Sequence, residues 1–171
     1  YLVQNVKEIP RIVKEAYYIA TTGRPGPVLI DIPNDIQLHK IPYAEFERLF
    51  DEKIELEGYS PTYEGHPVQI KRAIKLIKEA KKPLIIAGAG VLKSKASKEL
   101  FEYAEKTQTP VAMTLLGLGA FPGSHELSLG MLGMHGTVPA NYATDEADLV
   151  IAAGVRFDDR IAGNPSKFIE N

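Results

Sequence analysis

Cysteine is absent from this sequence of 171 residues. Disulfide bonds, thiolate nucleophiles and thiolate metal sites are therefore excluded. The sequence also lacks HxH, HExxH and carboxylate-rich spacings, so no metal site is expected. It contains neither a GxSxG nucleophile motif nor a phosphate-binding P-loop. The usual motifs of serine hydrolases and of P-loop NTPases are thus missing.

Long hydrophobic runs and a strong charge of one sign are absent as well. No stretch approaches the roughly 18 apolar residues that mark a transmembrane helix. The formal net charge is −2 and no basic run occurs, so neither nucleic acid nor a membrane is an expected partner. Hydrophobic residues make up 44% and charged residues 25%, which is typical of a globular protein with a buried core. The chain opens at Tyr1 with charges where a signal peptide has an apolar block, so we expect a fragment or a processed chain.

The first part of the sequence predicts one helix and one strand. Apolar residues recur at spacings of three and four over 8–22, with Pro10 in the first turn and Gly23 as the stop. The continuous apolar run 28–32 predicts a buried strand that Pro33 ends. Residues 34–66 show no lasting period and many acids and prolines, so we expect a linker and a domain boundary there.

The second part predicts an α/β fold, with a parallel sheet that carries helices on both faces. Its strands are apolar throughout and alternate with amphipathic segments, which is typical of parallel sheets covered on both sides. We expect Ser94 to cap the second helix. A long glycine-rich passage covers 116–136. The expected helices are 70–82, 95–106 and 138–146, and the expected strands are 84–87, 110–114 and 149–153.

Two glycine motifs are candidates for ligand binding, because open parallel sheets bind ligands beyond the carboxyl ends of their strands. The first directly follows an expected strand, and the second lies in the glycine-rich passage, just before an expected helix. Gly88-Ala89-Gly90 either lets a phosphate approach the backbone or forms a tight turn, since the third glycine of the dinucleotide fingerprint is missing near Lys93. In the segment 133–136, glycines at both ends leave room for a flat ligand beside Met134 and His135. The alternative for His135 is a helix-capping or core histidine.

A third cluster is the GVRFDDR segment, in which Gly154 ends a strand and four charges follow. Arg156 and Arg160 are suited to phosphate or carboxylate oxygens, and Asp158 and Asp159 to orienting them or accepting from hydroxyls. The alternative is a surface salt-bridge cluster that contributes little to stability. Arg24, between Gly23 and Pro25, is either a plain turn residue or a rigidly presented charge.

Four segments together resemble the catalytic large subunit of acetolactate synthase (acetohydroxyacid synthase), a thiamine-diphosphate-dependent family. They occur in the order GRPGPVLIDIPNDIQ, KPLIIAGAG, PVAMTLLGLGAFPGSHELSLGMLGMHGTVPAN and ADLVIAAGVRFDDRIAGNPSKF, and they cover essentially the whole chain. The pair GMLGMHG and GVRFDDR is more specific than any single glycine motif.

The resemblance implies a domain division and an activity. Residues 1–40 resemble the end of a pyrimidine-binding domain, 41–66 a linker, and 67–171 most of a central FAD-binding domain. Enzymes of this family join two pyruvates, or pyruvate and 2-oxobutyrate, with loss of CO2 in branched-chain amino acid biosynthesis. Thiamine diphosphate and Mg²⁺ would bind outside this chain, and the fragment alone is predicted to be inactive. The family also implies a homodimer or homotetramer, a regulatory small subunit and, for a prokaryotic source, a cytoplasmic location.

The resemblance further implies which residues contact FAD and which border the substrate channel. The channel residues would be Met134, Asp159 and Arg160. The FAD contacts would be Arg24, Gly88, Ala89, Gly90, Thr114, Leu115, Leu132, Gly133, Met134, His135, Gly154, Arg156, Asp158 and Arg160.

One position departs from the family pattern, which often has lysine where this sequence has Asn34. Alternative functions are the central domain of another thiamine-diphosphate enzyme, such as pyruvate oxidase or glyoxylate carboligase, and a stand-alone nucleotide-binding module. A sirtuin-like NAD-dependent deacylase is a further alternative, although its usual cysteine zinc site is missing.

Overall fold

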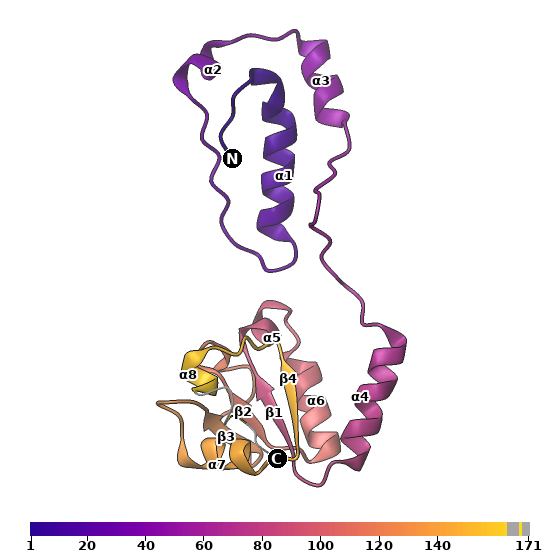
Figure 1. Ribbon diagram of the computed structural model, residues 1–171, viewed down its shortest axis with the longest axis vertical. Helices are drawn as coiled ribbons and strands as arrows, with labels where there is room; N and C mark the ends of the chain where they lie inside the picture. The colour runs from indigo at the N-terminus through magenta and orange to yellow at the C-terminus, as the bar shows by residue number, and fades with distance from the viewer. Residues whose placement is uncertain (164–167, 169–171) are drawn as a thin grey trace. The chain divides into compact units, whose positions relative to one another are not determined.

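The computed structural model describes residues 1–163 and 168, and the chain forms two compact units, 1–66 and 67–171 (Figure 1). Residues 164–167 and 169–171 lie outside the described residues, so NPSK of the GNPSKF segment is not described. Within the described part, no helix combines the length and apolar character needed to cross a bilayer.

The first unit is built on helix α1 (Ile9–Thr21), which follows a short 3-10 turn, η1 (Val6–Glu8). The helix agrees with the prediction for 8–22. Its apolar face packs Ile12 against Val3 and Ile36 in a small core. Helices α2 (Asn34–Leu38) and α3 (Tyr43–Asp51) complete the unit. Lys14 Nζ ties α1 to the end of α3 by donating to the carbonyl oxygen of Phe50 at 2.6 Å.

Two expectations for this unit are wrong in part. The run 28–32 is not a strand, because in the described chain it pairs only through one isolated parallel bridge, between Leu2 and Asp31. The segment 34–66 is not irregular throughout, since α2 and α3 lie within it. Both helices begin directly after a proline and are too short to give a lasting period.

The second unit contains the parallel sheet that the sequence predicted. Its strands are β1 (Pro83–Ala87), β2 (Val111–Met113), β3 (Ser128–Met131) and β4 (Leu149–Ala153), in the order β3-β2-β1-β4. Every neighbouring pair is parallel, with Ile85 of β1 opposite Val111 and Ile151. All carboxyl ends therefore meet at one edge.

Helices cover both faces of this sheet, which confirms the predicted α/β fold (Figure 1). Helix α6 (Ser97–Thr107) packs Leu100 and Ala104 against Ile85 and Val111 on one face. On the other face, α7 (Val138–Glu146) packs Ala140 with the second core cluster, which contains Leu84 and Ile86 of β1. The remaining elements are α4 (Pro67–Glu79), α5 (Ala89–Lys93), the 3-10 turn η2 (Leu115–Gly117) and α8 (Asp159–Ala162).

Three details of this unit differ from the sequence-based expectations. Strand β3 lies inside the glycine-rich passage, where Gly130, with φ of +84°, interrupts any regular strand pattern. Ser94 does not cap α6, because its hydroxyl donates to the carbonyl oxygen of Gly90 at 2.8 Å and ends α5 instead. The isoleucines of α4 share a face, but Ile70 and Ile74 are 48% and 45% exposed.

Candidate functional site

Three glycine turns pack directly on one another at the carboxyl edge of the sheet. The Gly90 amide donates to the carbonyl oxygen of Gly154 at 3.0 Å, and the Gly88 amide donates to that of Ala153 at 2.9 Å. A Cβ atom on Gly117 would overlap the carbonyl oxygen of Ala87. The glycines therefore let β1, β2 and β4 bring their following turns into backbone contact, which no larger residue allows.

The segment after β3 forms a tight turn that presents two side chains. The Gly136 amide donates to the carbonyl oxygen of Gly133 at 2.8 Å and closes the turn. Met134 and His135 occupy its middle, and both are exposed, with Met134 at 74%. The Met134 amide also donates to the carbonyl oxygen of Arg160 at 3.2 Å, so this turn contacts α8.

The charged cluster after β4 is organised by Asp158. Its Oδ2 atom accepts from Arg156 Nη2 at 3.1 Å, and its Oδ1 atom accepts from the Arg160 amide at 3.2 Å, which caps α8. The Arg156 side chain is 74% exposed, so this surface pair contributes little to stability. Its exposed guanidinium is accessible to an anionic ligand.

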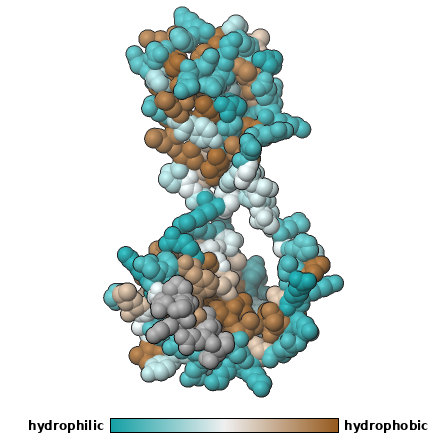
Figure 2. Space-filling model, in the orientation of Figure 1, coloured by the Kyte–Doolittle hydropathy of each residue, from teal (hydrophilic) through white to brown (hydrophobic). Residues whose placement is uncertain are grey.

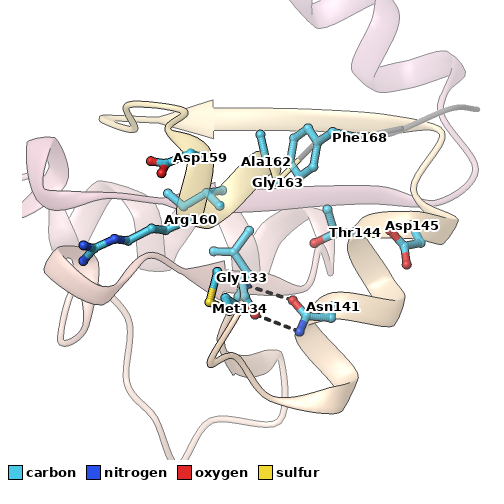
Figure 3. Close-up of a pocket in the computed structure, with 12 residues that line it drawn as sticks. Gly133, Met134, Asn141, Thr144, Asp145, Asp159, Arg160, Ala162, Gly163 and Phe168 are labelled. Carbon is cyan, nitrogen blue, oxygen red and sulfur yellow. Dashed lines mark hydrogen bonds between the residues drawn. The ribbon is translucent and has the colours of Figure 1, made fainter. Parts of the chain in front are cut away.

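A pocket of about 290 Å³ lies between α7 and α8 (Figure 3). Met134, Asp159 and Arg160, the residues expected along a substrate channel, line it together with Asn141 and Thr144. The figure shows the Arg160 side chain extending away from Asn141, toward the outside of the pocket. Residues of both charge signs, Asp159 and Arg160, thus line the pocket, and the turn after β3 forms part of its wall.

The predicted FAD contacts of the second unit all follow the carboxyl ends of its four parallel strands. Residues 88–90 follow β1, 114–115 follow β2, 132–135 follow β3, and 154–160 follow β4. Gly88, Thr114 and Leu132 are buried, whereas the others are partly or fully exposed. Arg24 belongs to the first unit, where it lies in the exposed turn after α1.

The surface of this edge suits a molecule with a flat apolar part and an anionic part. Large apolar side chains are exposed after three strands: Leu115 is 65% exposed, Met134 74% and Phe157 47%. Hydrophobic side chains reach the surface in each unit (Figure 2), and at this edge of the sheet the turn after β4 also carries the exposed guanidinium of Arg156. An exposed apolar patch beside polar groups is typical of a ligand site. The residues present therefore fit a dinucleotide such as FAD.

Sequence reasoning missed two residues of this edge. Gly117 allows the turn after β2 to meet β1, and only its place within a glycine-rich passage hinted at this. Asn141 binds both backbone polar groups of Gly133 from helix α7. Asn141 lies eight residues after Gly133, in the first turns of a predicted helix, and no sequence pattern indicated that the two residues are in contact. Among the described residues, no cluster of three or more potential ligands for a metal ion exists.

Comparisons with known proteins agree with this fold. Residues 70–171 match the family described as thiamine pyrophosphate enzyme, central domain. A solved structure from Mycobacterium smegmatis, described as a thiamin diphosphate-dependent enzyme, covers 89% of this chain at a TM-score of 0.65 and 25% identity. The chain covers 28% of that protein.

Several acetolactate synthase large subunits are similar over the full chain, which confirms the resemblance found in the sequence. That of Buchnera aphidicola is 48% identical over 171 residues, which are 100% of this chain and 29% of that protein. That of Corynebacterium glutamicum is 50% identical over 168 residues, or 98% of this chain and 26% of that protein. The chain thus spans less than a third of the length of these relatives. Since the family match extends over more than half of the chain, this protein belongs to the thiamine pyrophosphate enzyme central-domain family.

Proposed function

We propose that the carboxyl edge of the sheet in the second unit binds FAD. The observation that carries this proposal is the convergence, after neighbouring parallel strands, of exposed apolar side chains and exposed guanidinium groups around closely packed glycine turns. Ligands of open parallel sheets bind at this edge. The apolar side chains suit the flavin ring, and the arginines suit the diphosphate.

Each group of residues has a separate task in this proposal. Arg156 binds diphosphate oxygens through its guanidinium, which forms stronger hydrogen bonds with anions than neutral donors do. Asp158 orients that guanidinium through the 3.1 Å contact and accepts from a hydroxyl of the cofactor. Leu115 and Met134 cover the flavin ring. The bound flavin does no net redox work in the main reaction of acetolactate synthases.

The first unit would contribute one further contact, from Arg24. The turn that carries it starts at Gly23, whose φ is +57° and where an added Cβ atom would lie 2.9 Å from the Tyr59 hydroxyl oxygen. In this division, residues 1–40 are the end of a pyrimidine-binding domain, 41–66 a linker and 67–171 the central FAD-binding domain.

The whole protein is proposed to be an acetolactate synthase, because its relatives of 48% and 50% identity carry that name. It would join two pyruvates, or pyruvate and 2-oxobutyrate, with loss of CO2. Thiamine diphosphate and Mg²⁺ would bind outside the present residues, so the chain alone has no carboligase activity. Met134, Asp159 and Arg160 would border the substrate channel, where Arg160 attracts the carboxylate of a 2-oxo acid.

Partners and location follow from the same relationship. The full protein would form a homodimer or homotetramer, bind a regulatory small subunit and act in the cytoplasm. These properties belong to the longer protein.

Titration of the 171-residue chain with FAD tests the binding proposal. We expect saturable quenching of flavin fluorescence and a rise in melting temperature, because a ligand that binds only the folded state stabilises it. ADP and NAD serve as comparison ligands. Stronger binding of NAD or ADP than of FAD would favour a general nucleotide-binding module instead.

A further inference from the structure

Asn141 of helix α7 makes a contact that stabilises the turn after β3. The amide of Gly133 donates to Asn141 Oδ1 at 2.9 Å, and Asn141 Nδ2 donates to the carbonyl oxygen of Gly133 at 3.0 Å (Figure 3). One side-chain carboxamide therefore binds both polar backbone groups of a single residue. The Asn141 side chain alone makes both hydrogen bonds.

Gly133 is a residue whose conformation needs such a restraint. Its φ is +100°, outside the range that other residues favour, and a Cβ atom there would lie 2.7 Å from the carbonyl oxygen of Arg160. Glycine is thus required, but glycine also has the most conformational freedom to lose. The two hydrogen bonds from Asn141 select one conformation among those that glycine permits.

The restrained turn is the one that presents Met134 and His135. Its other end is fastened by Thr137, whose amide donates to the carbonyl oxygen of Met131 at 2.7 Å and whose hydroxyl donates to that of Leu129 at 2.5 Å. Strand β3 and helix α7 thus hold the turn at both ends. Asn141 holds the residue that precedes Met134, whose own amide donates to the carbonyl oxygen of Arg160 at 3.2 Å.

We propose that Asn141 is a positioning residue, which fixes the turn 133–136 in the conformation that presents Met134 and His135 to the flavin. This inference rests on the proposed function. Asn141 acts through Gly133 and does not itself touch the cofactor.

Two substitutions separate the hydrogen bonds from side-chain packing. N141L keeps the number and branching of the side-chain heavy atoms and removes both hydrogen bonds. N141D keeps the acceptor for the Gly133 amide, but its ionised carboxylate faces the carbonyl oxygen of Gly133 without a proton to donate. Protonation restores that donor, so N141D regains the lost contact at low pH. Y142F, at the next and exposed position of the same helix, is the matched control.

The measurements are hydrogen exchange at the Gly133 amide and FAD affinity of the 171-residue chain. For N141L we expect exchange at Gly133 to be about tenfold faster and FAD binding about tenfold weaker than in the unsubstituted chain and Y142F. For N141D we expect similar losses at about pH 7.5 and a partial recovery at about pH 4, close to the ordinary pKa of an aspartate, as the carboxyl takes up its proton. N141L should show no such recovery.

Failure of this inference differs from failure of the proposed function. Unchanged exchange at Gly133 in N141L, or faster exchange with unaltered FAD affinity, would overturn the role of Asn141. If the unsubstituted chain does not bind FAD, the proposed function fails, and exchange at Gly133 alone then decides whether Asn141 fixes the turn.

Discussion

Gly90 and Gly154 exclude side chains from each other's positions. A Cβ atom on Gly90 would lie 2.5 Å from the Cα atom of Gly154, and one on Gly154 would lie 2.6 Å from the Cα atom of Gly90. Gly154 also has a φ of +61°. The turns after β1 and β4 therefore meet backbone to backbone, and this contact holds the Arg156 segment beside the turn at 88–90.

Substitution of Gly90 by alanine should destabilise the second unit. The added methyl group overlaps backbone atoms that cannot move without shifting β4, so we expect a loss of about 1–3 kcal/mol in the free energy of unfolding. Gly123→Ala is the matched control, because a Cβ atom there would meet nothing within 4 Å. Equal stability of the two variants in urea denaturation would show that the turns do not pack in this way.

Substitution of Arg156 by glutamine should weaken FAD binding without loss of stability. Its guanidinium is exposed and its ion pair with Asp158 lies at the surface, so stability should not change. We expect about tenfold lower affinity for FAD, because the substitution removes one charge-assisted hydrogen bond to the diphosphate. Lys98→Gln removes the same charge from α6 and serves as control, since the Lys98 side chain is 83% exposed. Equal weakening in both variants would indicate a general charge effect instead.

Asp148 should make stability depend on pH at the acid end. Its carboxylate accepts from the amides of Lys81 at 2.7 Å and Lys82 at 2.9 Å, and these hydrogen bonds hold the pKa of Asp148 below its ordinary value. The carboxylate therefore stabilises the folded state above its ordinary pKa, and this contribution is lost as the pH falls through the lowered pKa.

The matching experiment is chemical denaturation of the unsubstituted chain and of Asp148→Asn across pH. We expect the unsubstituted chain to be the more stable at neutral pH and the difference to shrink below about pH 4. A difference that stays constant down to the acid end would contradict a role for the ionised carboxylate.

His125 should stabilise the glycine-rich passage through packing and hydrogen bonds. Its ring meets those of Phe101 and Phe121 edge-on, with centroids 5.3 Å and 5.2 Å away, and its Nε2 lies 3.0 Å from Glu105 Oε1. We expect His125→Ala to lower the free energy of unfolding by about 1–3 kcal/mol. The exposed His66 provides the control, His66→Ala, for which thermal denaturation should detect no change.

The sheet of the second unit was predictable because its strands and helices follow simple rules. The runs 84–87 and 149–153 are apolar throughout, which is typical of parallel strands, although β4 at the end of the strand order is only partly buried. Helix α7 begins at Val138 as expected. The prediction that a ligand binds at the carboxyl edge needed only the parallel order of the strands.

The missed features depend on contacts between distant residues. Strand β3 contains a glycine with positive φ, so its sequence has no strand pattern, and only pairing with β2 makes it a strand. The run 28–32 has the apolar pattern of a strand, but within the described residues it pairs only through the isolated bridge between Leu2 and Asp31. The role of Asn141 depends on a turn eight residues away, and that of Gly117 on the backbone of β1. Local sequence carries none of this information.

Hydrogen exchange of all backbone amides, with and without saturating FAD, is the most direct test of whether FAD binds at the carboxyl edge of the sheet. We predict that FAD slows exchange in the turns after the four parallel strands, at residues 88–93, 114–118, 133–136 and 154–160. Protection concentrated instead at the opposite edge of the sheet, around Lys82 and Asp148, or no protection at all, would contradict the account.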